Sequence, residues 1–113
     1  MIKMYLKDND LDTNTYLKLR KSVNWKPLTE KQAEKAIENS ILTLVAYDEG
    51  KPIGMGRIVG DGAVICYIQD LIVIPEYQGK GVGQMLMESL IDFVKELKLP
   101  DTQIMLDLMC AVG

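Results

Sequence analysis

Hydrophobic and polar residues alternate along the chain with two periods, and each change of period predicts an element. Residues 2–6 alternate as a half-buried strand does. Asp12 then precedes apolar residues at helical spacing, which predicts an N-cap and a helix through about Val23. The sequence from Thr29 to Gln32 has the capping-box pattern, and it predicts a second helix that runs to about Glu38.

Three apolar runs follow, separated by turns rich in glycine and aspartate. They predict three consecutive antiparallel strands over residues 40–47, 52–59 and 63–74. Gly54 and Gly56 lie inside the second run, where glycine weakens a strand and leaves no side chain to pack. The two glycines therefore predict a bulge or a close approach of another segment.

A long helix and a last strand complete the pattern. Apolar residues at helical spacing form one stripe over 82–97, and Leu99 before proline ends this helix. Residues 102–111 read as a fifth strand, and a right-handed crossover makes 63–74 and 102–111 parallel neighbours. The order strand, helix, helix, three strands, helix, strand predicts an α/β fold, specifically an α+β sandwich with a mixed sheet of about five strands.

The composition narrows the classes of function. The chain has 113 residues, which suits one domain over 1–113, and its net charge of -3 with scattered basic residues argues against a nucleic-acid binder. Two cysteines and no histidine exclude a Ser-His or Cys-His nucleophile, and no metal is expected. No apolar run approaches the ~20 residues that span a membrane, and the N-terminus lacks a signal-peptide pattern, so a cytoplasmic protein without a membrane partner is expected.

The turn between the third run and the long helix contains Gly79, Gly81 and Gly83. The first amides of a helix lack partners and carry the positive end of its dipole, so a turn without side chains here is shaped for a pyrophosphate. The alternative is a tight turn whose glycines only allow close packing of strand and helix. Lys80 is followed by Gly81 and Val82, so the pattern fits neither a Walker A loop nor the G-x-G-x-x-G dinucleotide fingerprint.

The segment from Val73 to Gly83, VIPEYQGKGVG, closely resembles the acetyl-CoA signature of the GNAT superfamily of N-acetyltransferases. The core of that signature is Gln or Arg, two residues, Gly, one residue, then Gly or Ala, which matches Gln78, Gly81 and Gly83. The predicted order of elements is similar to the GNAT fold over the whole chain. The resemblance implies a transferase that uses acetyl-CoA as cosubstrate, in which a small-molecule or protein amine attacks the thioester directly.

In the GNAT fold the central and last strands diverge, and the pantetheine arm of the cosubstrate lies between them. By resemblance, the central strand is expected to contact pantetheine, and the turn and first helical residues are expected to hold the pyrophosphate through backbone amides. An amide near the end of the central strand is the expected oxyanion donor. The implied cofactor-binding residues are Leu71, Ile72, Val73, Gln78, Gly79, Lys80, Gly81, Val82, Gly83 and Gln84.

Family members often use an acid on the central strand as general base, and Asp70 is the only acid there. By strand alternation Asp70 shares a face with Ile68 and Ile72, and a carboxylate in apolar surroundings has the proton affinity that a base needs. The alternative is a structural carboxylate that accepts backbone or helix-cap hydrogen bonds. Asp107 is the second candidate. Trp25 matches an aromatic residue that commonly lines the acceptor pocket of the family, with a core-covering role as its alternative.

After the fifth strand, GNAT proteins normally continue with a helix that carries a tyrosine, the acid for the leaving thiolate, and with two more strands. This sequence ends at Gly113, so the domain is expected to be truncated. A second hypothesis is therefore a CoA-binding protein or fragment with little or no transferase activity, and a third is a nucleotide-binding α/β domain. A second chain, as in a homodimer, is expected to cover the open edge of the last strand.

Overall fold

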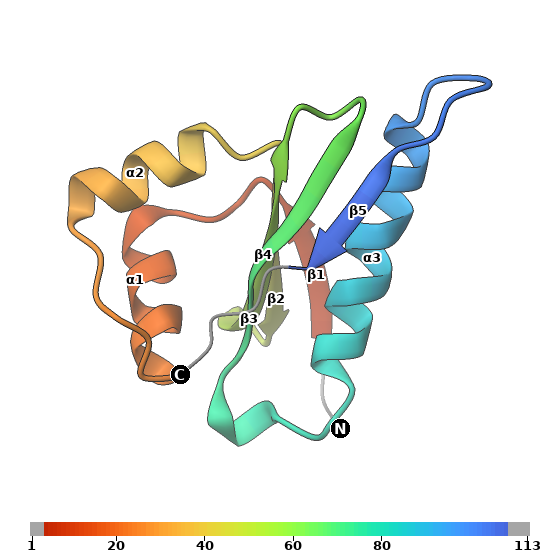
Figure 1. Cartoon of the computed structure of the whole chain (residues 1–113). Helices are drawn as coiled ribbons and strands as arrows, with labels where there is room; N and C mark the ends of the chain where they lie inside the picture. Colours follow the sequence, from red (N-terminus) through yellow and green to blue (C-terminus); the bar gives the residue numbers. More distant parts are fainter. Residues whose placement is uncertain (1–3, 109–113) are drawn as a thin grey trace.

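A computed structural model describes residues 4–108, which form one mixed sheet with helices on both faces (Figure 1). Helices α1 and α2 cover one face, and α3 lies against the other. The order of elements confirms the predicted α+β sandwich. The elements are β1 (Met4–Asp8), α1 (Thr13–Ser22), α2 (Glu30–Glu38), β2 (Leu42–Asp48), β3 (Lys51–Gly60), β4 (Ile65–Val73), the short 3-10 helix η1 (Pro75–Tyr77), α3 (Val82–Leu97) and β5 (Met105–Leu108).

Side-chain caps fix where the first two helices begin. The Asp12 carboxylate accepts a hydrogen bond from the Thr15 amide at 2.7 Å, which satisfies one of the unpaired donors of α1. Thr29 and Gln32 form the predicted capping box at the start of α2. Both start signals were therefore read correctly from local sequence.

The strands lie in the order β1-β2-β3-β4-β5, and every pair is antiparallel except the last. Strands β4 and β5 are parallel, with Ile65 opposite Met105 and Ile68 opposite Leu108. This confirms the predicted crossover through α3. The predicted last strand also included residues 109–111, which lie outside the described residues.

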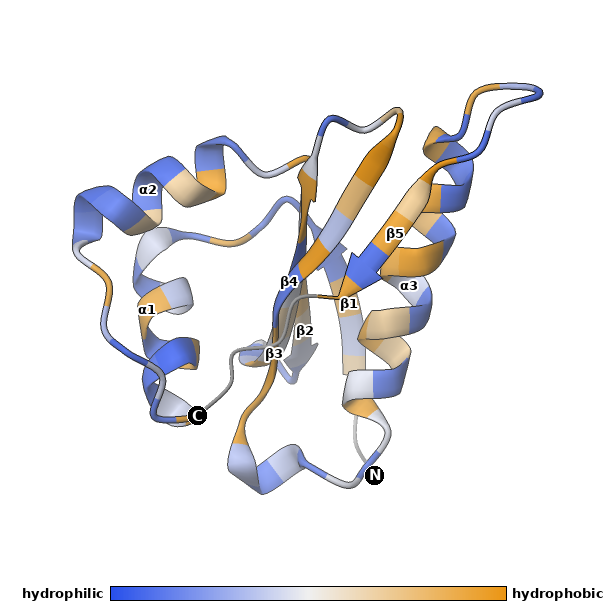
Figure 2. Cartoon of the chain, viewed as in Figure 1, coloured by the Kyte–Doolittle hydropathy of each residue, from blue (hydrophilic) through white to orange (hydrophobic). Residues whose placement is uncertain are grey.

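The core fills the space between the sheet and the helices. Helix α3 contributes a buried stripe, Val82, Leu86, Leu90 and Val94. Helix α2 buries only Ala33 and is mostly hydrophilic, whereas α3 carries long hydrophobic stretches (Figure 2). Packing of α3 therefore contributes more to the hydrophobic core than packing of α2, and α3 anchors the turn that precedes it.

A bulge interrupts β4 at Asp70. Met55 lies opposite Ile72, but Arg57 lies opposite Gln69, so β4 contains one extra residue over this stretch. Asp70 has a positive φ of 53°, as the extra residue of a bulge can have. The bulge turns the Asp70 side chain toward α1.

The bulge changes which residues share a face of the sheet with Asp70. The Asp70 side chain contacts α1. Ile68 lies on the other face, because it is opposite Ile58, and Ile58 is on the same side of β3 as Gly56, which faces α3. The prediction that Asp70 shares a face with Ile68 and Ile72 was therefore wrong for Ile68, because simple alternation does not hold across a bulge, whereas Ile72, opposite Met55, lies on the Asp70 face.

The two glycines of β3 lie where α3 approaches the sheet. A Cβ on Gly54 would come within 2.8 Å of the Ile72 carbonyl oxygen, whereas one on Gly56 would meet only the end of the Leu90 side chain, at 2.7 Å. This confirms the predicted close approach. We expect Gly54→Ala to lower the free energy of unfolding by about 2 kcal/mol and Gly56→Ala by less than about 1 kcal/mol, because a side chain moves aside more easily than a strand. Urea unfolding of both variants measures the difference, and equal losses would contradict this explanation.

Candidate functional site

The loop between β4 and α3 contains two glycines in the left-handed region. Gly79 has φ 76° and Gly81, the N-cap of α3, has φ 87°, which glycine adopts without strain. A Cβ at either position would meet nothing within 4 Å. The backbone conformation, and not crowding by neighbouring atoms, therefore requires glycine at both positions, and the space beside them is open.

This open space faces the start of α3. Met85 donates to the Gly81 carbonyl at 3.1 Å and closes the first turn, so the amides of Val82, Gly83 and Gln84 precede the first bond of the helix. The Gln84 side chain donates to Glu88 at 3.1 Å, which leaves its backbone amide as its contribution to the turn. The structure thus brings the predicted residues 79–84 together at one helix terminus that suits an anion.

Gln78 uses its side chain to hold the loop. Its Nε2 donates to the carbonyl oxygen of Val73 at 2.9 Å, which ties the loop to the end of β4. Lys80 lies with its Nζ 5.4 Å from the centre of the Tyr77 ring. Tyr77 in turn donates from its hydroxyl to the carboxylate of Asp48, the last residue of β2.

One edge of β4 has no strand beside it near this loop. The Ile74 amide donates to the Ile53 carbonyl at 2.9 Å, so the neighbouring Val73 amide points to the opposite edge, toward β5. Beyond Ile68 the described residues contain no strand opposite β4 on this edge. Because backbone groups alternate between the two edges, Leu71 and the amide of Val73 are available to an extended ligand there, as in β-strand addition. The predicted residue Ile72 directs its backbone toward β3 instead.

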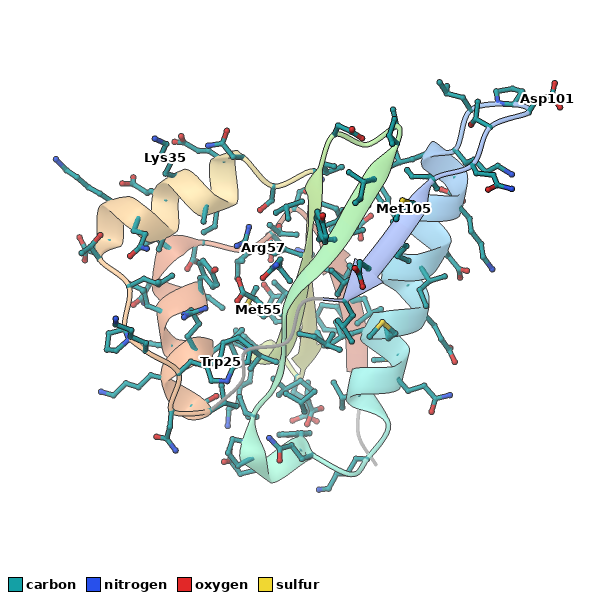
Figure 3. All side chains as sticks on the ribbon, in the orientation of Figure 1. Trp25, Lys35, Met55, Arg57, Asp101 and Met105 are labelled. Carbon is teal, nitrogen blue, oxygen red and sulfur yellow. The ribbon has the colours of Figure 1, made fainter. Side chains whose placement is uncertain are left out.

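Asp70 lies in a polar cluster between α1 and the sheet, and Figure 3 shows Arg57 in this region. Its Oδ1 accepts from Arg20 at 2.9 Å, and its Oδ2 accepts from Arg57 at 2.7 Å and from the Tyr16 hydroxyl. Only 7% of the Asp70 side chain is exposed. Both oxygens are committed to fixed donors, which favours the structural alternative for this residue over a free general base.

The cluster shifts the pKa values of its members. Burial raises the pKa of the Tyr16 phenol, and its hydrogen bond to the Asp70 carboxylate raises it further. Burial is the largest single influence on the pKa of Arg57 and lowers it, but the hydrogen bond to Asp70 and the charge interactions with Tyr16 and Asp70 together raise the pKa above the ordinary value. The phenol therefore stays protonated and the guanidinium stays charged at neutral pH, as the geometry of the cluster requires.

Trp25 joins this cluster through Arg20. The guanidinium of Arg20 lies 5.3 Å from the Trp25 ring centre and also donates to the Lys26 carbonyl at 3.1 Å. Trp25 is half-buried and packs against the core beside α1 (Figure 3). Asp107 is exposed on β5, and its carboxylate accepts from the next amide, that of Leu108. The structure thus links Trp25 with Asp70 and leaves Asp107 apart.

Sequence reasoning missed the partners of Asp70. Tyr16 and Arg20 share a face of α1 because they are four residues apart, and Arg57 is a charged residue inside an otherwise apolar strand. An arginine in such a strand was the available signal, since a buried charge needs an opposite one. This signal did not show that Asp70 is the opposite charge, because only the bulge directs the Asp70 side chain to this face of the sheet.

The comparisons with known proteins agree with this geometry. The family model of the acetyltransferase (GNAT) family matches residues 9–109. The chain belongs to the GNAT acetyltransferase family. The structure is similar to a GNAT-family acetyltransferase from Streptococcus pneumoniae, with a TM-score of 0.79 and 28% identity, covering 100% of this chain and 78% of that one.

Two further relatives extend this result. A protein of unknown function from meticillin-resistant Staphylococcus aureus has a TM-score of 0.83 and 30% identity, covering 98% of this chain and 80% of that chain. The uncharacterized N-acetyltransferase ycf52 from Gracilaria tenuistipitata var. liui is 32% identical over 106 residues, which are 89% of this chain and 57% of the relative. The chain thus spans about half the length of the curated relatives it matches.

None of the helices within 4–108 combines the length and apolar character that crossing a membrane requires. Over the same residues, histidine, cysteine and carboxylate side chains form no group of three or more that could hold a metal ion.

Proposed function

We propose that this GNAT domain transfers the acetyl group of acetyl-CoA to an amine. One observation supports the proposal above the others: the glycine turn at the start of α3 lies next to the open edge of β4. A CoA thioester has both parts that this arrangement suits, a pyrophosphate for the turn and an extended arm for the edge of β4. The open space at Gly79 and Gly81 fits the pyrophosphate, because no side chain blocks the amides there.

The chain's own groups then have separate tasks. The amides of residues 79–84 hold the pyrophosphate, and the edge at Leu71 to Val73 orients the arm, which brings the two reactants together. The Val73 amide donates to the carbonyl oxygen that gains negative charge during attack. Gln78 supports this amide, since it holds the carbonyl of the same residue. Bound acetyl-CoA supplies the activated acetyl group.

Two parts of the proposal rest on the chain's relationship to its family alone. Asp70 as general base remains a prediction, and its three donors favour a structural role. The acceptor amine is a small molecule or a protein group, with Trp25 as the predicted wall of its pocket. A CoA-binding protein with little or no turnover therefore remains the second candidate, favoured by the committed oxygens of Asp70.

Binding and turnover separate the two candidates. We expect calorimetry to show acetyl-CoA binding with a dissociation constant in the micromolar range, with ATP binding much more weakly, because ATP lacks the pantetheine arm. Thiol release from acetyl-CoA is then measured with a panel of alkylamines, polyamines, amino acids and peptides. Binding with amine-dependent thiol release supports the transferase, and binding without release supports the CoA-binding protein. Failure to bind acetyl-CoA would contradict both.

The assembly and location belong to the proposal as well. Met105 and Leu108 of β5 are exposed, and no strand among the described residues pairs with the outer edge of β5. A second copy of the chain across this edge stays a prediction, which light scattering at tens of micromolar protein tests directly. Cytoplasmic location is the setting that the proposal assumes.

A further inference from the structure

The loop that precedes α3 is attached to a distant part of the sheet by a single side chain. Tyr77 ends η1, and its hydroxyl donates to the carboxylate of Asp48, which ends β2. Strand β3 lies between β2 and β4 in the sheet, so this bond crosses the end of β3. It therefore connects the glycine turn with the β2–β3 hairpin, which local sequence does not place together.

The same tyrosine contacts the only charged residue of the glycine turn. The Lys80 ammonium lies 5.4 Å from the ring centre, and the Tyr77 amide donates to the Ile74 carbonyl at 2.9 Å. Tyr77 is thus held at its backbone by Ile74, the residue after β4, and at its hydroxyl by the end of β2, and its ring supports Lys80. The hydrogen bond to Asp48 raises the pKa of Tyr77, so the phenol remains the donor at neutral pH.

A turn with three glycines in five residues has unusually many accessible conformations. Ordering it only when a ligand binds would cost affinity, because the entropy of ordering is then subtracted from the binding free energy. Helix α3 holds the C-terminal end of the turn. The N-terminal end is exposed at Gln78, and its side chains make two attachments to the sheet, the Gln78 bond to Val73 and the Tyr77 bond to Asp48.

We propose that Tyr77 and Asp48 form a positioning pair that preorganises the turn for its pyrophosphate ligand. The inference rests on the proposed function, since it concerns the same cofactor turn. Neither side chain needs to touch the ligand. Their bond holds the turn in the conformation in which Gly79 and Gly81 have positive φ, the first amides of α3 precede the first helical hydrogen bond, and Lys80 lies beside the Tyr77 ring.

The test compares two tyrosines that make the same kind of bond. Tyr77→Phe removes only the hydroxyl that binds Asp48. We expect it to raise the dissociation constant of acetyl-CoA about fivefold to tenfold, as the loss of one charge-assisted hydrogen bond would. Tyr47→Phe is the matched control, because the Tyr47 hydroxyl donates to the Asp10 carboxylate on another part of the fold. It is expected to leave the affinity within twofold.

Substitutions of Asp48 complete the test. Asp48→Asn keeps an oxygen that accepts from Tyr77 and is expected to retain most of the affinity. Asp48→Ala should reproduce the loss, and the double variant with Tyr77→Phe should lose no more than either single variant, because both remove one interaction. Additive losses would overturn the pairing, and so would a normal affinity in Tyr77→Phe.

The kinetic pattern separates positioning from general destabilisation. With a responsive amine, Tyr77→Phe should raise KM for acetyl-CoA and leave kcat and the KM of the amine unchanged. An equal loss of affinity in Tyr77→Phe and Tyr47→Phe would overturn the proposal, since a general effect of stability would explain both. If the wild-type chain fails to bind acetyl-CoA, the proposed function fails. If it binds without turnover, the dissociation constants still test the pair.

Discussion

Gly81→Asp is expected to weaken the binding of acetyl-CoA at least a hundredfold. Gly81 is the N-cap of α3 and has φ 87°, where an L-residue costs roughly 1–2 kcal/mol. Its Cβ direction leads into open space beside the helix amides, so the new carboxylate would lie where the pyrophosphate is proposed to bind. At about 5 Å, two phosphate charges repel a carboxylate by about 2 kcal/mol in water and by more where solvent is partly excluded.

Two variants separate the causes of this loss. Gly62 has φ 76° in the β3–β4 turn, at the other end of β4, and a Cβ there would make only an ordinary contact with Ile41 at 3.6 Å, so Gly62→Asp introduces similar strain and charge away from the cofactor turn. It is expected to bind acetyl-CoA as the wild type does. Gly83→Ala adds a Cβ at 3.6 Å from the Val73 side chain, an ordinary contact, and should have a mild effect. Calorimetry measures all three. An unchanged affinity in Gly81→Asp would remove this residue from the site.

The elements of the fold were readable from the sequence because their signals are local. Asp12 and the capping box at Thr29 mark two helix starts, and the stripe over Val82–Leu97 gives the third helix. The boundaries of the predicted strands differ from the observed ones by one to three residues within 4–108, and the largest difference is at the start of β5, which begins at Met105 and not at residue 102. Their order followed from short turns and the handedness of the crossover, which are general rules of chain connection.

The bulge at Asp70 was not readable, because a period of two residues does not reveal an insertion. The same limit applies to contacts across long separations. Tyr16 and Asp70 are 54 residues apart in sequence, and Tyr77 and Asp48 are 29 apart. The glycine turn could be located because its residues are consecutive. The surroundings of the candidate base could not, because they depend on three elements meeting at one point.

Asp70→Ala is expected to lower the free energy of unfolding by about 3–5 kcal/mol, because it leaves two largely buried guanidinium groups without a counter-charge. The side chains of Arg20 and Arg57 are each only 15% exposed, so water replaces the lost carboxylate poorly. The total free energy of unfolding of a domain of this size is about 5–15 kcal/mol, so this loss is a large part of it. Asp107→Ala, at an exposed position, should change stability by less than about 0.5 kcal/mol. Urea unfolding compares the two, and equal stabilities would contradict a structural role for Asp70.

Asp70→Asn distinguishes the structural role from the catalytic one. Asparagine retains one oxygen for the donors of Tyr16, Arg20 and Arg57 but loses the negative charge between the two guanidinium groups. If Asp70 is structural, stability falls and the remaining folded protein keeps its kcat with a responsive amine. If Asp70 is the general base, kcat falls by about 10²–10⁴ in protein that is still folded. Because three donors already occupy both oxygens of the carboxylate, we expect the first result.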